Sequence, residues 1–514
     1  MSNQISQNNK RIAKNSLMLY IRMFFIMIVT LYTSRVVLKA LGVEDFGIYN
    51  VIAGVVAMFG IVSGAMSSAT ARFLTYELGR GDYNQLKKVF NICILIYFSL
   101  ALLFVILSES VGVWFFNTQL VIPSERMTVA NIVFQCSILT VVCEMMIQPY
   151  QSLIISHEKM SLYAMTSIVE ALAKLVIAFV VSMIDIDHLL LYGILMTCCL
   201  CMAKSIYFFY CKKHYEESRF MFFFDKNMFK TILSYSGWNL FGSSAALVKM
   251  QGLNILLNMF FNPSVNAARA IAVQVNGALV QFEQNFYTAV RPQITKYYAQ
   301  NDLQNMFKLV FRSSKMSFYL VLLLAVPITV EAPYIIELWL GQLPEHVVIF
   351  TRLIIAISAT ECVAHPIMTS CHATGHVALY QSLVGTATIL NIPISYVILK
   401  MGYPPVSVFV VSLIISTICI FMRVWVLKRV IESFPVYKYI RDVVCVCFFI
   451  GSISFIIPIF VHSLLPSGLL STLVVCFTGV LSVLVTAYSF GLNKPEKDFA
   501  CMVGNKILNK IWKK

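Results

Sequence analysis

The chain has 514 residues, of which 59% are hydrophobic and only 12% are charged, and its mean hydropathy is +0.79. Soluble domains are about 45–50% apolar and about 25% charged, so this composition excludes an ordinary water-soluble protein. Disordered, collagen-like and disulfide-scaffold proteins are excluded as well. The apolar runs are about 20 residues long rather than short alternating segments, which predicts an all-α polytopic membrane protein and not an outer-membrane barrel.

Apolar runs bounded by charge, Gly, Pro or Asn predict about fourteen transmembrane helices. In chain order they lie near 16–38, 48–70, 90–112, 127–147, 161–183, 188–210, 231–260, 265–289, 316–338, 348–370, 378–400, 404–426, 443–464 and 467–490. With the N-terminus placed in the cytoplasm, most of the 39 Lys and Arg residues fall in inside loops. This positive-inside pattern predicts that both termini are cytoplasmic. The net charge of +15 then reflects topology and contact with anionic membrane lipids, and no nucleic-acid partner is expected.

Two halves of the chain resemble each other. Residues 71–90 resemble 291–310, with Thr75 matching Thr295, and residues 148–163 resemble 365–380 at nearly the same offset. The repeat unit contains six predicted spans, and an even number means that both copies cross the membrane in the same direction. The sequence therefore predicts two parallel six-helix lobes, 1–222 and 223–430, followed by residues 431–514 with two further helices and a basic cytoplasmic tail.

Two such lobes commonly enclose a cavity and move against each other to give alternating access, so transport is the expected function. The loops are too short for a soluble catalytic domain, and the sequence holds no phosphate-binding Gly-rich loop followed by Lys and Ser or Thr. We therefore expect a transporter rather than an enzyme, driven by an ion gradient, by the membrane potential or by the substrate's own gradient. A monomer is expected, since one two-lobe chain can enclose its own pathway.

Charged side chains inside apolar spans are costly and commonly face a cavity or a partner. Six basic residues lie within or at the ends of the first two spans of each half: Arg22, Arg35, Arg72, Lys249, Arg269 and Arg291. If they face inward, they would form a cationic, substrate-binding cavity between the lobes that suits a diphosphate or an acidic sugar. The alternative for Arg35, Arg72 and Arg291 is that they extend to the membrane interfaces.

The acidic residues within spans are Glu144, Glu170, Glu283 and Glu361. Glu170 and Lys174 are four residues apart on one helix face, so they can form either a structural ion pair or a coupling site. Glu144 and Glu361 have no obvious partner on their own helices. The candidate ion-coupling residues are thus Glu144, Glu170, Lys174 and Glu361, with H⁺ or Na⁺ as the coupling ion and no other cofactor.

A metal site is considered for one histidine-rich segment. His372 and His376 are four residues apart, near Glu361 and His365, but Gly375 lies between them at the predicted inside end of a span. Histidines at the membrane interface are the better interpretation, and no metal is expected.

The N-terminal residues resemble a known family. An Arg toward the end of the first helix is followed by a Leu-Gly-x-x-x-Phe-Gly-x-Tyr turn and an Ala-rich second helix that ends in Arg. These features fall here on Arg35, Leu41-Gly42, Phe46-Gly47, Tyr49 and Arg72. The pattern resembles the Wzx-type polysaccharide flippases of bacteria, the O-antigen and capsule exporters of the multidrug/oligosaccharidyl-lipid/polysaccharide (MOP) superfamily. "ELWLG" at 337–341 resembles the family's outer turn in the second lobe.

The resemblance implies a MATE-like fold and a location in the bacterial cytoplasmic membrane. It also implies a substrate, an undecaprenyl-diphosphate-linked oligosaccharide used for lipopolysaccharide, capsule or another exported polysaccharide, and a polysaccharide polymerase as a candidate partner. By position and charge, Arg22, Arg35, Arg72, Lys249 and Arg269 would contact the headgroup.

Two other functions compete with this interpretation. A multidrug and toxin extruder of the same fold would export organic cations, and its cavity would be expected to favour acidic and aromatic residues. A membrane-embedded polysaccharide polymerase would be expected to have a large outside loop and no six-helix repeat, and this chain shows the reverse.

Overall fold

The computed structural model describes residues 2–57, 60–119, 123–184, 186–261, 263–341, 343–466, 468–493 and 496–497. Every regular element among these residues is a helix, which confirms the predicted fold class. The basic tail ending in Lys513-Lys514 lies outside the described residues. The chain divides into two compact units. The first comprises Met1–Ser244, Thr288–Leu303 and His372–Ser382, and the second comprises Ala245–Tyr287, Gln304–Cys371 and Leu383–Lys514. The boundaries predicted at residues 222 and 430 stay predictions.

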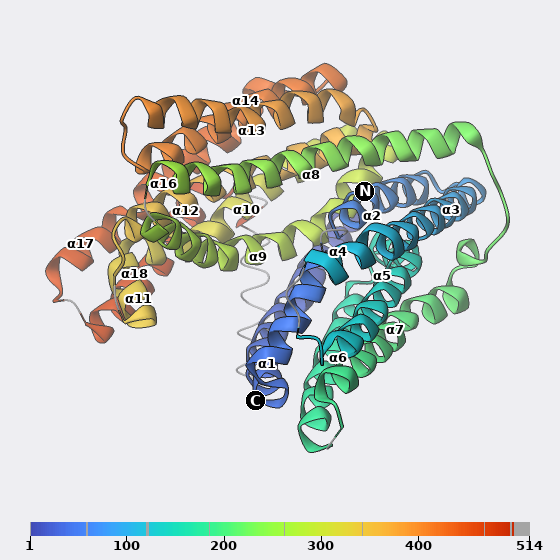
Figure 1. Cartoon of the computed structure of the whole chain (residues 1–514). Helices are drawn as coiled ribbons and strands as arrows, with labels where there is room; N and C mark the ends of the chain where they lie inside the picture. The colour runs from blue at the N-terminus through green and yellow to red at the C-terminus, as the bar shows by residue number, and fades with distance from the viewer. Residues whose placement is uncertain are drawn as a thin grey trace, which may run out of the picture. The chain divides into compact units, whose positions relative to one another are not determined.

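The first unit is a bundle of seven labelled helices and adjoining segments (Figure 1). These are α1 (Ser2–Ala57), α2 (Gly60–Arg80), α3 (Tyr83–Leu107), α4 (Val113–Gln119), α5 (Met127–Ser156), α6 (Met160–Met183) and α7 (His188–His214). Helix α1 packs along α6, and α5 packs along α3 and α7. The side chains of Phe90, Tyr97 and Phe134 are fully buried in its core.

Helix α1 contains one break, at Gly42. Its φ of 76° and ψ of 170° place Gly42 in a region of backbone conformation that is essentially restricted to glycine. The turn predicted around Leu41-Gly42 is therefore present as a kink within α1.

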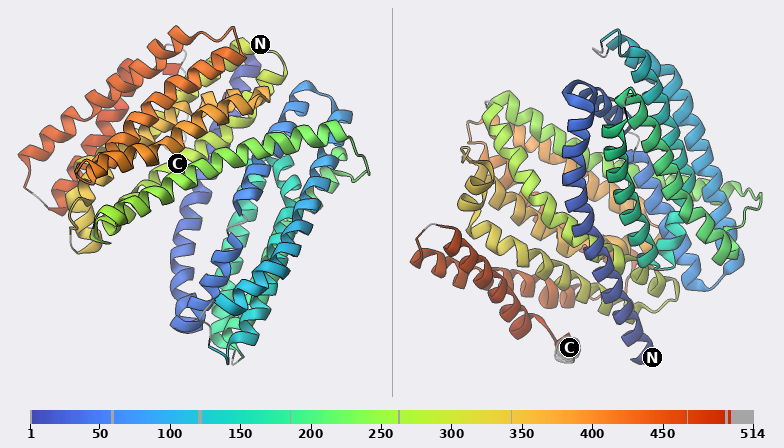
Figure 2. Two further views of the ribbon diagram at one scale, coloured as in Figure 1. Left: turned by 45° about the horizontal axis from the view of Figure 1, so that its top comes forward. Right: turned by 90° about the horizontal axis from the view of Figure 1, so that it is seen from below.

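The second unit also contains only helices among its described residues (Figures 1 and 2). Helices α8 (Lys226–Phe260) and α9 (Pro263–Ala299) contribute residues to both units. The remaining helices are α10 (Leu303–Val330), α11 (Ala332–Leu340), α12 (Val347–Thr374), α13 (Val377–Lys400), α14 (Val406–Val430), α15 (Val436–Tyr439), α16 (Val446–Ser454), α17 (Ile456–Leu464) and α18 (Leu469–Thr486). Helices α16 and α17 correspond to the span predicted at 443–464 and α18 to the span predicted at 467–490. Helix α17 packs against α18.

Twelve helical segments among the described residues are long and apolar enough to cross a membrane. The spans predicted at 48–70 and 265–289 fall on the end of α1, on α2 and on α9, and neither α2 nor α9 is among the twelve. Both α2 and α9 are helical but more polar than the twelve apolar helices, so the count of fourteen transmembrane helices stays a prediction. Polar helices of this kind are stable in a bilayer only where other protein segments cover them.

The backbone supports the internal repeat. Positive φ is adopted mainly by glycine and seldom by other residues. Gly81 (φ 74°) and Asn301 (φ 56°) adopt it at equivalent positions of the first pair of matching segments. In the second pair, Glu158 (φ 59°) and Gly375 (φ 86°) are likewise equivalent. The two halves thus share their turns as well as their sequence pattern.

A charged cluster holds the first unit together near the kink in α1. Arg126, just before α5, forms ion pairs with Asp45 of α1 and with Asp187, and its Nε lies 2.9 Å from Asp45 Oδ1. The hydrogen bond to Asp45 is the largest influence on Arg126 and raises the pKa of its guanidinium. Asp187 also caps α7 by accepting a hydrogen bond from the Leu190 backbone N–H at 3.0 Å.

Replacing Arg126 with methionine should destabilise the first unit. The substitution removes two ion pairs and leaves Asp45, which is 9% exposed, without its cation. We expect a loss of about 2 kcal/mol, discounted for the partial exposure of the pair. Thermal unfolding of the purified protein in detergent measures this effect, and Arg35→Met, on the exposed side chain of the same helix, is the control. Equal unfolding temperatures for both variants would contradict a stabilising role for Arg126.

Candidate functional site

The predicted site residues are distributed over both units. Those in the first unit are Arg22, Arg35, Arg72, Arg291, Glu144, Glu170 and Lys174, and those in the second are Lys249, Arg269 and Glu361. Each unit is described separately, so the single cationic cavity predicted between the lobes stays a prediction. Each unit does contain a polar cavity of its own.

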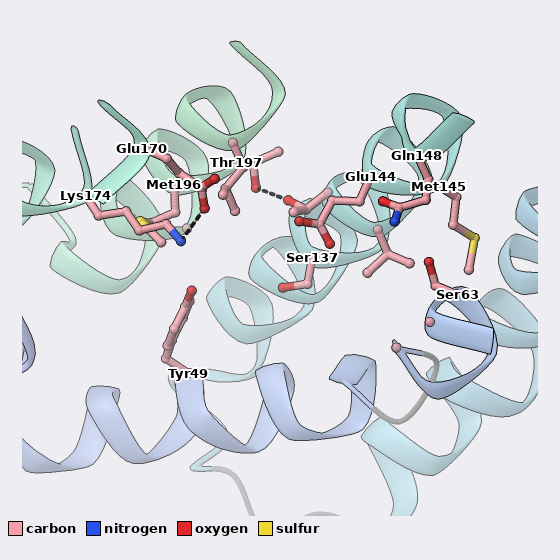
Figure 3. Close-up of a pocket in the computed structure, with 16 residues that line it drawn as sticks. Tyr49, Ser63, Ser137, Glu144, Met145, Gln148, Glu170, Lys174, Met196 and Thr197 are labelled. Atoms are coloured by element: carbon pink, nitrogen blue, oxygen red, sulfur yellow. Dashed lines mark hydrogen bonds and ion pairs between the residues drawn. The ribbon is translucent and has the colours of Figure 1, made fainter. Parts of the chain in front are cut away.

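The cavity of the first unit has a volume of about 490 Å³ and lies among α1, α2, α5, α6 and α7. Figure 3 shows Glu144 and Gln148 on α5, with Glu170 and Lys174 on α6. Tyr49 points from α1 in the direction of the Glu170–Lys174 pair. The polar helix α2 supplies Gly60, Ser63 and Gly64 to the lining. These small residues keep the wall on that side open.

Two carboxylates and two ammonium groups form a network at this cavity. Lys174 Nζ lies 2.8 Å from Glu170 Oε1, which confirms the ion pair predicted from their spacing. Lys204, on α7, lies 3.7 Å from Glu170 Oε2 and 3.5 Å from Glu144 Oε1. Glu144 therefore has a partner, but on a neighbouring helix. The sequence interpretation missed Lys204, although a lysine within an apolar span was a signal that could have revealed it.

Two pairs of uncharged polar side chains also lie at this cavity. Gln148 Nε2 donates a hydrogen bond to Ser67 Oγ at 2.6 Å, and the hydroxyl of Thr140 lies 3.0 Å from that of Thr197. Arg22 also acts electrostatically on Glu170. A proton or cation that bound to Glu170 would compete with the two lysines for its oxygens, which would link ion binding to side-chain movement.

Arg22 differs from the other predicted cations of the first unit. Its guanidinium carbon lies 4.6 Å from the centre of the Tyr163 ring. Its Nε is buried and has no hydrogen-bond partner among the described residues. A buried donor in that condition costs free energy, and an anion that bound there would recover it.

The other three arginines of the first unit have different surroundings. Arg72 is buried, donates a hydrogen bond to the Ala373 carbonyl oxygen at 2.7 Å, and lies over the rings of Phe73 and Tyr76. Arg291 donates to the Ser68 carbonyl oxygen at 3.1 Å. Arg35 is exposed. Arg72 and Arg291 thus both contact backbone carbonyl oxygens, and the two roles considered for them stay predictions.

The second unit contains a smaller cavity of about 120 Å³, lined by residues of α9, α10 and α12. Among them, Glu283 Oε1 lies 3.0 Å from His365 Nδ1. Glu361 also lines the cavity and lies 3.8 Å from Lys249 Nζ. Helix α9 forms part of the wall of this cavity, as the polar helix α2 does in the first unit. The sequence placed His365 at the membrane interface and did not associate it with Glu283.

Arg269 is buried in the second unit by contacts within the protein. It donates a hydrogen bond to the Met250 carbonyl oxygen at 2.8 Å and another to the side chain of Asn254. Both partners belong to α8, so Arg269 joins α9 to α8.

The described residues contain no group of three or more His, Cys, Asp or Glu side chains that could hold a metal ion. Within that part of the chain, His372 contributes to an aromatic cluster instead. Its ring lies 6.2 Å from that of Tyr235 and 5.4 Å from that of Tyr380.

Glu217 is a buried carboxylate that lies outside the predicted spans. Its Oε1 is 2.8 Å from His157 Nε2, and the His157 ring stacks on Tyr215. Burial by itself raises the pKa of the Glu217 carboxyl, but hydrogen bonds from His157 and from the backbone outweigh burial and hold the pKa below its usual value. The carboxylate therefore stabilises the fold above the pKa of its unfolded form, and this contribution is lost as the pH falls through the lowered pKa.

Glu217→Gln should make the thermal stability of the protein less sensitive to a fall in pH. We expect the wild-type protein to lose more thermal stability than the variant when the pH falls from about 5 to about 3. Melting temperatures of both proteins across that range test this expectation. The same loss in both proteins would show that Glu217 makes no acid-sensitive contribution.

Comparison with known proteins identifies the fold. No protein-family model and no curated protein sequence matches the chain. An outward-facing multidrug resistance transporter of the MATE family of the MOP superfamily matches with a TM-score of 0.70 at 11% identity, over 82% of this chain and 96% of that one. The Vibrio cholerae MATE transporter VcmN in its bent form matches with a TM-score of 0.65 at 13% identity, over 85% and 99% of the two chains.

A MOP superfamily transporter from Pyrococcus furiosus also matches, with a TM-score of 0.67 at 12% identity, over 82% of this chain and 96% of that one. Its binding pocket is described as having reversed polarity, which suggests a different function for that protein. At these identities the comparisons establish the fold, which is that of MATE transporters within the MOP superfamily, and they leave the substrate to be argued from the residues.

Proposed function

We propose that this protein is a multi-pass membrane transporter that works by alternating access. The support is its fold, its twelve apolar helices and the polar cavity in each unit. Polar and ionisable side chains within apolar spans commonly mark the pathway of a solute or ion. The proposed location is a bacterial cytoplasmic membrane, with both termini in the cytoplasm.

The proposed substrate is an undecaprenyl-diphosphate-linked oligosaccharide that is moved from the inner to the outer leaflet. The observation that carries this proposal is Arg22, an arginine within an apolar helix whose buried Nε has no hydrogen-bond partner among the described residues. Arginine binds phosphate oxygens through two parallel hydrogen bonds. The resemblance of the N-terminal motif to polysaccharide flippases supports the same substrate.

We propose the Glu170–Lys174–Lys204–Glu144 network as the site that couples transport to H⁺ or Na⁺. Protonation of Glu170, or binding of a cation to it, would release the ammonium groups of Lys174 and Lys204 from this carboxylate. Such a change in charge within one cavity can favour one conformation of the bundle over another.

A multidrug or cation antiporter is the second candidate. The cavity of the first unit contains two carboxylates, a feature expected of a site for organic cations, and the matched structures include MATE transporters. Excess basic residues in α1, α8 and α9 favour an anionic substrate instead.

The test is the distribution of lipid-linked sugars between leaflets in a strain lacking this protein, profiled by mass spectrometry with a leaflet-accessibility probe. Single repeat units trapped on the cytoplasmic leaflet support the flippase. Normal delivery to the outer leaflet contradicts it, and an unchanged glycan profile with new drug sensitivity supports the antiporter.

A further inference from the structure

Glu158 occupies an unusual position in the first unit. It lies in the turn between α5 and α6 with a positive φ of 59°, and its side chain is fully buried. A buried carboxylate at a strained backbone position persists only where its surroundings compensate for both costs.

Three donors from two other helices compensate for this burial. Arg11 Nε, near the start of α1, lies 2.7 Å from Glu158 Oε2. From the end of α9, Lys296 Nζ lies 2.6 Å from Oε1, and Gln293 Nε2 lies 2.7 and 2.8 Å from the two oxygens. Asn15 of α1 also donates to the Glu158 carbonyl oxygen at 3.2 Å. One carboxylate thus joins α1, the α5–α6 turn and α9, and all of these contacts lie within the first unit.

The same region contains a reciprocal contact. Arg72 of α2 donates to the Ala373 carbonyl oxygen at the end of α12. It also lies beside Gly375 in the turn that follows, and Gly375 is the repeat equivalent of Glu158. The ends of α2 and α9 also meet, because a Cβ added at Gly79 would lie 2.7 Å from Ala299 Cβ. The second helix of each repeat therefore reaches the turn of the other repeat.

We propose that Glu158, Arg11, Gln293 and Lys296 form a latch that closes the predicted cytoplasmic ends of the two repeats and opens once in each transport cycle. This inference rests on the proposed transport function and assigns a step of it to named residues. Losing only one cation would leave a buried, poorly compensated carboxylate, so the contacts break together rather than one at a time. The Arg11 side chain is 45% exposed, which gives water a route to the carboxylate as the latch opens.

Hydrogen–deuterium exchange of the full-length protein in lipid nanodiscs tests the latch. For Glu158→Gln we expect exchange to accelerate by roughly tenfold or more in three segments together, 8–16, 153–162 and 291–299, because one shared contact holds them. The control is Glu217→Gln, which removes a buried carboxylate beside His157 without touching α9. Its effect should be confined to residues near 157 and 217.

Acceleration confined to 153–162 in Glu158→Gln, or equal profiles for both variants, would contradict the latch. If Glu158→Gln does not yield folded protein, Lys296→Gln removes one partner and should accelerate the same three segments to a smaller extent. The outcome is independent of the substrate assay. If the three segments open together but the deletion strain still delivers lipid-linked sugar normally, the latch is retained and the flippase is rejected. If the segments do not open together but the deletion strain traps the sugar on the cytoplasmic leaflet, only the latch is rejected.

Discussion

Replacing Arg22 with alanine is expected to reduce glycan export by roughly 10- to 100-fold, the equivalent of one charge-assisted hydrogen bond to an anionic substrate. Its guanidinium lies over Tyr163 and retains a buried, unpaired Nε, so it is available to bind phosphate oxygens. Removing it breaks no ion pair among the described residues, so folding should be preserved. Export is measured as the fraction of lipid-linked repeat units on the outer leaflet, and the protein level in the membrane is measured in parallel.

Three further substitutions define what Arg22 contributes. Arg22→Lys keeps the charge but loses the two-pronged donor, so intermediate export is expected. Arg35→Ala alters an exposed side chain of the same helix and should have little effect. Arg269→Ala should lower both export and stability, because Met250 and Asn254 would lose a donor. Full export by Arg22→Ala would remove the cationic-site hypothesis.

Glu170→Gln is expected to uncouple transport from the ion gradient and to slow it by roughly tenfold or more, since two lysines would lose their shared carboxylate. Glu170 lies 2.8 Å from Lys174 and 3.7 Å from Lys204, so it is the centre of the network. The measurement is flipping in liposomes with and without an imposed pH or sodium gradient. Wild-type protein should respond to one of these gradients, and the variant should respond to neither.

Glu144→Gln is the matched control for this experiment. Glu144 contacts only Lys204 in the described ion-pair network, at 3.5 Å, and its side chain is 44% exposed. Its loss should therefore slow transport less than loss of Glu170 and leave some gradient response. A Glu170→Gln variant that still follows the gradient would place coupling elsewhere, with Glu283, His365 and Glu361 of the second unit as the next candidates.

Local sequence patterns predicted local structure well. The apolar runs predicted helices, and the four-residue spacing of Glu170 and Lys174 predicted an ion pair that the structure contains. The matching segments of the repeat carry equivalent turns in the structure, where Glu158 and Gly375 share their positive φ. Such features depend on residues close in the chain or on the repeat itself.

The contacts that sequence reasoning missed join distant segments. Lys204 meets Glu144 and Glu170 because α7 packs beside α5 and α6, and no spacing along the chain encodes that neighbourhood. Glu158 was not a candidate, since a glutamate in a turn is ordinarily exposed. Its burial depends on Lys296, more than a hundred residues away.

Polarity also affected the prediction of spans. Helices α2 and α9 are less apolar than their neighbours, and each forms part of the wall of a polar cavity. Hydropathy alone identifies lipid-facing helices better than helices that line an interior. The two predicted spans that are not among the twelve apolar helices are thus ones that line a candidate cavity.

The most direct test of the central claim is flipping by the purified protein in liposomes. An undecaprenyl-diphosphate-linked oligosaccharide with a fluorescent sugar is incorporated into both leaflets, and a membrane-impermeant reagent then quenches accessible label. We expect the inner-leaflet label to become accessible with wild-type protein and to remain protected with Arg22→Ala. Protected label with wild-type protein, together with uptake of an organic cation by the same liposomes, would contradict the flippase and establish a cation transporter.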